Sequence, residues 1–265
     1  MTAPYQLSEA LHHYGKHVHI LNDPFLTTQL ARLCSAEVTQ PLFNELIRVL
    51  YTSMIRTVIN AEFPREFVAM DTRMKALTDA GVYRGEIIAR ETPSVVVDIA
   101  RAGILPSQIC YDTLNSILNP SAVRQDHLIM ARTVDDHQQV TGASISGSKI
   151  GGKIEDCMVL FPDPMGATGN SLRTAIQSYL SGELGRPRAI FTLNLIITPE
   201  FIRTMTDALP EVPIYALRID RGMSDPEVLG SAPGLHWERE SGLNEQQYIV
   251  PGGGGFGELM NNSWI

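Results

Sequence analysis

The chain has 265 residues, of which 44% are hydrophobic, and its formal net charge is −8. This length is enough for one large α/β domain with a full buried core. The acidic balance argues against nucleic acid or an anionic membrane as the main partner, because both favour clustered Lys and Arg. It does not exclude a small anionic substrate, since one local loop can outweigh the global charge.

The sequence has no clear feature of secretion, membrane insertion or cysteine redox chemistry. No signal peptide is recognisable, and no apolar run approaches the roughly 20 residues that a membrane helix needs. The three cysteines Cys34, Cys110 and Cys157 are far apart and form no C-x-x-C pattern. Such cysteines are typical of reduced, mostly buried thiols. We expect a soluble cytoplasmic protein with no membrane contact.

Apolar periodicity predicts the secondary structure in chain order. Residues 39–63 have apolar side chains at helical spacing, with Thr39 where an N-cap belongs and Pro41 where a first-turn proline belongs. Short apolar runs predict strands covered on both faces, at 94–100, 127–131, 157–161, 189–197 and 212–219. Helical stretches lie near 104–118, 170–182 and 199–208. This alternation predicts an α/β fold with a mainly parallel twisted sheet flanked by helices, whose ligands bind beyond the carboxyl ends of the strands.

Two polar segments, 133–153 and 220–247, are too long for simple connections in a compact domain. Both follow predicted strands, so they belong to the edge of the sheet where a ligand is expected. The alternating pattern of 133–153 predicts an exposed hairpin or a mobile lid. Surface excursions without a function are the alternative for both segments.

Residues 158–171, MVLFPDPMGATGNS, combine a buried strand, one acid and a run of small residues before a helix begins. Glycines let the backbone approach a ligand closely, and the start of the helix adds N–H groups that attract a phosphate. Thr168 and Ser171 add hydroxyl donors. An acid beside a phosphate would repel it, so Asp163 is best explained as an acceptor for sugar hydroxyls. The pattern indicates a ribose 5-phosphate; it matches neither a Walker loop nor the G-x-G-x-x-G fingerprint, and an ordinary turn is the alternative.

A family resemblance is carried by three segments: DIARAGILPSQI (98–109), FPDPMGATGNS (161–171) and GLNEQQYIVPGGGGFGE (242–258). They resemble the Arg-Ala-Gly segment, the phosphoribosyl pyrophosphate loop and the uracil loop of the uracil phosphoribosyltransferases, a branch of the type I phosphoribosyltransferases. VHILNDPFLTTQLARL (18–33) is more weakly similar to their amino-terminal segment. The resemblance covers most of the chain in the expected order.

The resemblance implies a single phosphoribosyltransferase-like domain over residues 1–265. Its parts would be an N-terminal helical segment over about 1–65, a core over about 66–219 and a C-terminal base-binding hood over about 220–265. The implied reaction transfers phosphoribose from phosphoribosyl pyrophosphate to uracil and yields UMP and pyrophosphate, with Mg²⁺ bound to the donor. The implied partners are these small-molecule substrates and further copies of the chain, in a homodimer or a higher homo-oligomer.

The resemblance also assigns site residues. Arg101 and Asp163 are implied to be catalytic, and no resident metal site is implied. The phosphoribosyl pyrophosphate site would consist of Arg101, Arg132, Asp163, Pro164, Met165, Gly166, Ala167, Thr168, Gly169, Asn170 and Ser171. The uracil site would consist of Ile249, Gly254, Gly255 and Phe256. A guanidinium suits a diphosphate because its planar fork donates to two oxygens, although an ordinary ion pair is the alternative for each arginine.

The uracil loop departs from the family's pattern. That pattern resembles Pro-Gly-x-Gly-Asp-x-Gly-Asp, whereas Gly255 and Glu258 stand at its two Asp positions here. Two alternatives to uracil transfer stay open. One is transfer to a different base, and the other is a non-catalytic regulator that binds nucleotides or phosphoribosyl pyrophosphate.

The histidines indicate no strong site. Four of them lie within eight residues and could bind a transition metal, but no Cys or carboxylate within the run completes a ligand set: His12, His13, His17 and His19. We expect no functional metal there. The isolated His127, His137 and His236 are expected to be structural or surface residues.

Overall fold

The computed structural model describes residues 5–134 and 140–263, and the side chains of 131–143 lie outside this description. The strands of its central sheet are β1 (Val18–Ile20), β4 (Ser94–Ala100), β5 (Val123–Val134), β6 (Val140–Lys149), β7 (Met158–Pro162), β8 (Met165–Gly166), β9 (Ala189–Ile197) and β10 (Ile214–Ile219). Their order is β1-β10-β9-β7-β4-β5-β6, with β8 paired to β9. Every neighbouring pair is parallel except β5 with β6, so the predicted mainly parallel sheet is confirmed.

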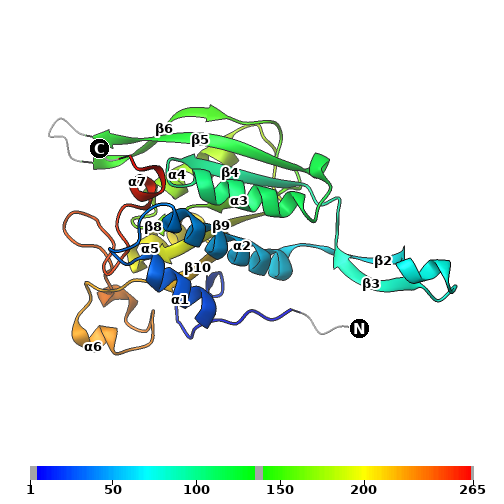
Figure 1. Cartoon of the computed structure of the whole chain (residues 1–265). Helices are drawn as coiled ribbons and strands as arrows, with labels where there is room; N and C mark the ends of the chain where they lie inside the picture. Colours follow the sequence, from blue (N-terminus) through cyan, green and yellow to red (C-terminus); the bar gives the residue numbers. More distant parts are fainter. Residues whose placement is uncertain (1–4, 135–139, 264–265) are drawn as a thin grey trace.

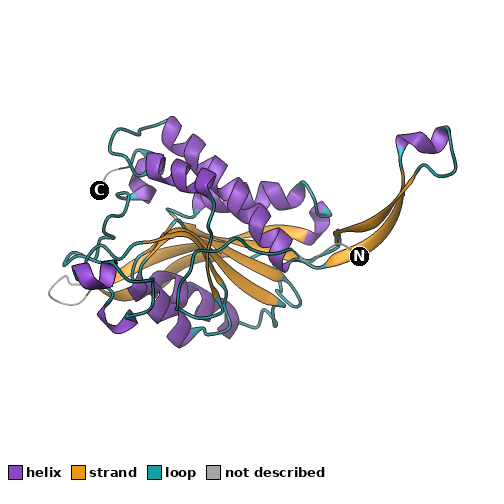
Figure 2. Cartoon of the chain, turned by 90° about the horizontal axis from the view of Figure 1, so that it is seen from below, coloured by secondary structure: helices purple, strands orange, loops and turns teal. Residues whose placement is uncertain are grey.

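Helices cover both faces of the sheet, as Figure 2 shows. One face carries α1 (Pro24–Leu33), α2 (Leu42–Glu62), α3 (Ile104–Asn115) and α7 (Phe256–Asn261), and the other carries α4 (Asn170–Ser181) and α5 (Pro199–Ala208). Successive β4 residues point into opposite cores, so Val96 packs on the first face and Val95 on the second. Burial on both faces explains why this strand has a continuous apolar sequence.

Most predicted elements are confirmed within a few residues of their predicted ends. The predicted strand 189–197 and helix 199–208 coincide with β9 and α5. The predicted capping of the long helix is wrong, because Pro41 is itself the N-cap of α2 and makes no side-chain hydrogen bond there. Thr39 acts through its main chain instead, since its carbonyl accepts the Phe43 N–H at 3.0 Å.

A hairpin arm, residues 65–88, projects from the end of the central sheet (Figures 1 and 2). It consists of β2 (Arg65–Asp71) and β3 (Val82–Ile88), paired antiparallel, with a 3₁₀ turn (Arg73–Ala76) between them. The predicted core 66–219 therefore contains a segment that stands outside the central sheet. The division of the chain into three parts stays a prediction. Large apolar side chains of the arm are exposed: Phe67, Met70, Met74, Leu77 and Tyr83.

The two long polar segments have different structures. In the segment 133–153, residues 133–134 and 140–149 belong to the paired strands β5 and β6, so the predicted hairpin is confirmed for them. Residues 135–139 lie outside the described residues, and the role of the segment as a lid stays a prediction. The segment 220–247 contains α6 (Pro226–Leu229) and a second 3₁₀ turn (Trp237–Arg239). A buried ion pair holds it, in which Arg221 Nη1 donates to Glu240 Oε1 at 2.7 Å.

The three cysteines are free. Cys110 and Cys157 are buried, Cys34 is half-buried, and burial raises the pKa of each thiol. The prediction of unpaired, mostly buried thiols is confirmed. Within residues 5–134 and 140–263, no helix has the length and apolar character needed to cross a membrane.

The chain between β7 and α4 forms hydrogen bonds with β9 and the start of α5, and it packs against α5. Gly166 of β8 lies opposite Ile197 of β9, and its carbonyl accepts the Thr198 N–H at 3.1 Å. A Cβ at residue 166 would lie 2.7 Å from the Phe201 ring. Packing against Phe201 therefore requires glycine at this position, whatever ligand the loop binds.

We expect Gly166→Ala to lower the free energy of unfolding by about 1–3 kcal/mol, because the added methyl group overpacks the contact with Phe201. Gly230→Ala is the matched control, since a Cβ there would meet the Glu227 carbonyl oxygen at 3.5 Å, an ordinary contact. Urea denaturation of both variants measures the difference. Equal stability of the two variants would contradict the packing argument.

Candidate functional site

Four loops meet at the carboxyl edge of the central sheet. They follow β4, β7, β9 and β10, which are consecutive neighbours in the parallel part of the sheet. Because parallel strands end at the same edge, the loops after them lie side by side. Figure 1 shows β8 and α7 at this end of the molecule.

The loop 163–169 is held from the β9 side by its carbonyl groups. The Pro164 carbonyl accepts the N–H groups of Leu195 and Ile196, both at 3.1 Å. The Ala167 carbonyl accepts the Thr198 hydroxyl at 2.6 Å. Carbonyl oxygens that would repel a phosphate are thus bonded inside the protein.

Helix α4 begins directly after this loop, as predicted. Gly169 is its N-cap and has φ +78°, in the left-handed region that favours glycine. The first N–H groups of a helix lack partners within the helix, and the positive end of the helix dipole adds to them. Thr168 accepts the Asn170 N–H at 3.4 Å, and Ser171 is exposed at the start of the helix. This geometry fits a phosphate monoester.

Asp163 is a half-buried acid at the end of β7. Its N–H donates to the Leu193 carbonyl at 3.0 Å, and its carbonyl accepts the Asn194 amide at 2.6 Å. Burial raises the pKa of the Asp163 carboxyl to about 6, a hydrogen bond from the Met165 backbone lowers it, and the charge of Asp98 raises it. An acid whose pKa is raised in this way is typical of a functional site.

Arg101 lies in the loop between β4 and α3. Its Nη1 donates to the Ser263 hydroxyl at 2.8 Å, and its Nη2 donates to Glu258 Oε1 at 3.0 Å. The structure therefore brings Arg101 together with the carboxyl-terminal segment. An ordinary ion pair is the alternative role of Arg101, and Arg101 does form one with Glu258. This ion pair joins the loop after β4 to the C-terminal segment, and both are parts of the expected substrate site.

Arg132 lies on β5, opposite Ala143 of β6. Its side chain lies outside the described part of the structure, so its contact with a diphosphate stays a prediction. His137 lies outside the described residues altogether.

The glycine-rich run 251–255 is fixed by an ion pair. Arg218 donates to the two carboxylate oxygens of Asp220 at 2.6 and 2.8 Å and to the Gly252 carbonyl at 2.9 Å. Asp220 also accepts the Gly252 N–H at 2.8 Å. The pair thus holds both main-chain groups of Gly252 and sets the path of the run. No local sequence pattern identifies Arg218 or Asp220, because only the path of the chain at the end of β10 brings them beside the run.

The residues predicted to contact uracil lie along the same loop. Ile249 forms an isolated antiparallel bridge, Gly254 has φ +85°, and Gly255 is the N-cap of α7. Phe256 is buried edge-on against Phe43, with 5.2 Å between the ring centroids. Phe256 can therefore contact a base only through its main chain, as predicted.

A buried acid beside the Arg101 loop is missing from the sequence analysis. Asp98 of β4 lies opposite His127 of β5, and its Oδ2 is 3.0 Å from His127 Nδ1. Burial raises the pKa of the Asp98 carboxyl, and His127 opposes the rise. His127 is exposed and contacts Asp98, so the prediction that it is a structural or surface residue is confirmed. Only strand pairing brings the two residues together, so no local sequence signal identifies them.

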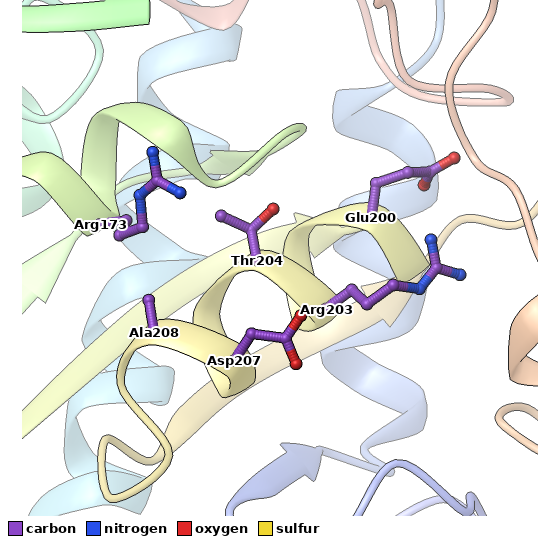
Figure 3. A pocket seen from close by; sticks show the side chains of 6 residues that line it. All are labelled: Arg173, Glu200, Arg203, Thr204, Asp207 and Ala208. Atoms are coloured by element: carbon purple, nitrogen blue, oxygen red, sulfur yellow. The ribbon is translucent and has the colours of Figure 1, made fainter.

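A pocket of about 390 Å³ lies between α4 and α5. Figure 3 shows that its lining carries both charges: Arg173, Glu200, Arg203, Thr204, Asp207 and Ala208. Arg203 donates to the Trp237 carbonyl and Glu200 accepts from the Ser241 hydroxyl, so both are already engaged by the C-terminal segment. The mixed lining favours neither an anion nor a cation, and the loops at the strand ends are the better candidate site.

A protein-family model and two relatives of this chain carry the same description. The family model described as "Uracil phosphoribosyltransferase" matches residues 20–235. A uracil phosphoribosyltransferase of Acidovorax ebreus (strain TPSY) is 27% identical over 245 residues, which cover 92% of this chain and 97% of that protein. One of Variovorax paradoxus (strain S110) is 26% identical with the same coverage.

A solved structure supports the fold. The AQ2163 protein of Aquifex aeolicus has a TM-score of 0.68 at 18% identity, and the match covers 92% of this chain and 97% of that chain. Family and fold together support phosphoribosyl transfer as the class of reaction. Since the family model matches most of the chain, and the loops that carry the family's motifs meet at one edge of the sheet, the chain belongs to the uracil phosphoribosyltransferase family.

Proposed function

We propose that the protein transfers phosphoribose from phosphoribosyl pyrophosphate to N1 of uracil, forming UMP and pyrophosphate, in cytoplasmic pyrimidine salvage. The observation that carries this proposal is the arrangement of Asp163 beside the 164–171 loop. It combines an acceptor for ribose hydroxyls with backbone donors for a phosphate. The names of the relatives, at about 27% identity, support uracil as the base.

In this proposal the donor lies along the carboxyl edge of the sheet. Asp163 accepts hydrogen bonds from the ribose hydroxyls, and the 164–171 loop binds the 5-phosphate through N–H and hydroxyl groups. Arg101 and Arg132 bind the diphosphate through their planar forks. The main chain of the uracil loop, 249–256, contacts the edges of the base.

The chemistry needs a leaving group, a positioned nucleophile and protection from water. N1 of uracil releases its proton and forms a bond to the anomeric carbon of ribose, and the electrons of the breaking carbon–oxygen bond leave with the diphosphate. This departure gives the ribose oxocarbenium character. The arginines stabilise the departing charge. The 133–153 hairpin acts as a lid that excludes water, which would otherwise hydrolyse the donor.

We propose that Mg²⁺ enters with the donor rather than occupying a resident site. In the described part of the chain, no group of three or more His, Cys, Asp or Glu could hold a metal. Mg²⁺ commonly binds through one or two carboxylates and the phosphates of its substrate, so donor oxygens and Asp163 fit it. Bound in this way, it would supply positive charge at the departing diphosphate.

Transfer to a related base is the second candidate, and Gly255 favours it. The family model matches only up to residue 235, before the uracil loop, and Gly255 removes a carboxylate that the family's pattern places near the base. We therefore expect weak use of uracil or a preference for a related base. Residue 255 has φ −81°, which accepts a side chain, although Glu258 Oε2 fills the space of its Cβ.

We expect Gly255→Asp to raise kcat/KM for uracil about tenfold, the effect of one charge-assisted hydrogen bond. The flexible Glu258 side chain has to move aside in this variant. The assay incubates the parent and the variant with phosphoribosyl pyrophosphate, Mg²⁺ and a panel of pyrimidine and purine bases, and identifies the nucleotide products by mass spectrometry. Gly230→Asp is the control, because it adds the same charge at an exposed position.

Two results would change the proposal. Efficient turnover of uracil by the parent, unimproved by Gly255→Asp, would show that Gly255 is a harmless variation and would leave uracil as the base. Thermal stabilisation by phosphoribosyl pyrophosphate without pyrophosphate release on any base would contradict a transferase and favour a regulator.

Asp163→Asn is expected to weaken donor binding and to stabilise the fold. The pKa of about 6 lies above the ordinary 3.8, so this group contributes stability that is fully present below pH 3.8 and is lost as the pH rises through 6. At about pH 7.5 we expect the variant to be about 1–2 kcal/mol more stable than the parent, with the difference vanishing near about pH 4. Loss of a charge-assisted bond should weaken phosphoribosyl pyrophosphate about 10- to 100-fold.

Urea denaturation across this pH range and calorimetric titration with the donor and Mg²⁺ measure both effects. Asp207→Asn is the control, because it neutralises an exposed acid on α5. Unchanged donor affinity in Asp163→Asn would remove the ribose assignment. Equal stability of variant and parent at neutral pH would contradict the cost of a charge at this half-buried position.

We also propose that the hairpin arm joins two copies of the chain in a homodimer. An isolated two-stranded ribbon is only marginally stable in water. This arm leaves Phe67 72% and Leu77 78% exposed, and a partner surface that covers such side chains would stabilise it. A second copy is the partner that the family resemblance implies.

The double variant Phe67→Ser/Leu77→Ser is expected to weaken the dimer by about two orders of magnitude or more, because each large apolar side chain contributes about 1.5–3 kcal/mol when buried. Light scattering after size-exclusion chromatography measures the mass, and thermal unfolding checks the fold. Leu229→Ser, at an apolar side chain 43% exposed on α6, is the control. A monomeric parent, or a double variant that keeps the mass and dissociation constant of a dimeric parent, would contradict the arm contact.

A further inference from the structure

The guanidinium of Arg101 is engaged by the carboxyl-terminal segment. Its Nη1 donates to the Ser263 hydroxyl at 2.8 Å and, more weakly, to the Ser263 carbonyl at 3.4 Å. Its Nη2 donates to Glu258 Oε1 at 3.0 Å. Both terminal nitrogens of the fork are therefore bonded within the chain, and these are the groups that a diphosphate would contact.

The two acceptors of Arg101, Glu258 and Ser263, are held close together by hydrogen bonds of the main chain around them. Glu258 lies on α7, where the Gln40 amide donates to the carbonyls of Leu259 and Met260 at 2.9 and 3.1 Å. The Ser263 N–H donates to the Glu258 carbonyl at 3.1 Å and so folds the chain back at the end of the helix. These bonds fix the main chain on which both acceptors are carried.

Helix α7 also packs directly on the Arg101 loop. A Cβ at Gly257 would lie 3.5 Å from Ala102 Cβ, which is van der Waals contact. Glu258 Oε2 fills the space that a side chain at Gly255 would occupy. The Glu258 carboxylate is thus located between Arg101 and the uracil loop, where it contacts both.

We infer that Glu258 competes with the diphosphate of the donor for the Arg101 guanidinium. The ion pair between Arg101 and Glu258 acts as a latch, which donor binding has to break. The inference rests on the proposed function, in which Arg101 binds the diphosphate. A carboxylate and a diphosphate accept hydrogen bonds from the same two nitrogens, so Arg101 exchanges one partner for the other. The latch is weak enough to open, because the side chains of Arg101 and Glu258 are 32% and 34% exposed.

The latch couples the donor site to the base site. When the diphosphate takes Arg101, the Glu258 carboxylate is released beside Gly255, at the edge of the uracil loop. Donor binding therefore changes the charge that an incoming base meets.

A role of Glu258 in orienting Arg101 would have the opposite effect on donor affinity. A latch competes with the diphosphate, so its removal strengthens binding. A residue that only orients the fork assists the diphosphate, so its removal weakens binding. The sign of the change in Kd separates the two roles.

The test is calorimetric titration of the full chain with inorganic pyrophosphate, and separately with phosphoribosyl pyrophosphate, in Mg²⁺ at fixed ionic strength. We expect Glu258→Gln, which keeps the shape and removes the charge, to lower both Kd values about two- to fivefold, the range of a partly exposed ion pair. Ser263→Ala is expected to lower them by a smaller factor. Glu238→Gln is the matched control, since it removes the same charge from an exposed residue of the C-terminal segment, and its Kd values should equal those of the parent.

An unchanged or higher Kd for Glu258→Gln, or an equal decrease for Glu238→Gln, overturns the latch and leaves the proposed function standing if the parent binds both ligands. Failure of the parent and all variants to bind either ligand overturns the latch and the proposed function together. Thermal denaturation checks the fold of each variant. Should Glu258→Gln fail to fold, the sign of the Ser263→Ala change decides.

Discussion

The parallel pairing of β4, β7 and β9 determines where the candidate site residues lie. Because the three strands run in one direction, their carboxyl ends carry the Arg101 loop, the Asp163 loop and the turn at Thr198 to one edge. The carbonyl groups of the Asp163 loop accept hydrogen bonds from β9 and from Thr198, so the sheet fixes the position of this loop. A loop fixed in this way suits a site that has to hold a phosphate and a sugar at a set separation.

The same edge holds charges that burial disfavours. Burial raises the pKa of both Asp98 and Asp163, which lie near the ends of adjacent strands. The charge of Asp98 is partly compensated by His127, whereas Asp163 is the proposed acceptor for the hydroxyl groups of a sugar. Stability alone would favour neutral side chains at such positions. A half-buried charge whose proposed partner is a ligand is therefore the physical basis of the proposed function. The same argument applies to Arg101, which is bonded to Glu258 and is proposed to bind a diphosphate.

Local sequence patterns predict the parts of this molecule whose determinants are local. Strands and helices of the sheet bury continuous apolar faces, and the loop 163–171 carries its small residues, hydroxyls and acid within one stretch. The hairpin arm has no such signal, because its large apolar side chains are exposed. Tertiary contacts have no local sequence signal either. Asp98 and His127 are 29 residues apart in the sequence, and Arg101 and Glu258 are 157 residues apart. The sequence resemblance could identify Arg101 as a site residue, but only the fold shows what already occupies its guanidinium.

A crystal structure of the protein with phosphoribosyl pyrophosphate and Mg²⁺ tests the position of the donor most directly. We expect the 5-phosphate at the N–H groups of the 164–171 loop and the ribose hydroxyls on Asp163. We expect the diphosphate on Arg101, with the contact between Arg101 and Glu258 broken. Donor density in the pocket between α4 and α5, or at the sheet edge without contact to Asp163 and this loop, would contradict the assignment of the site.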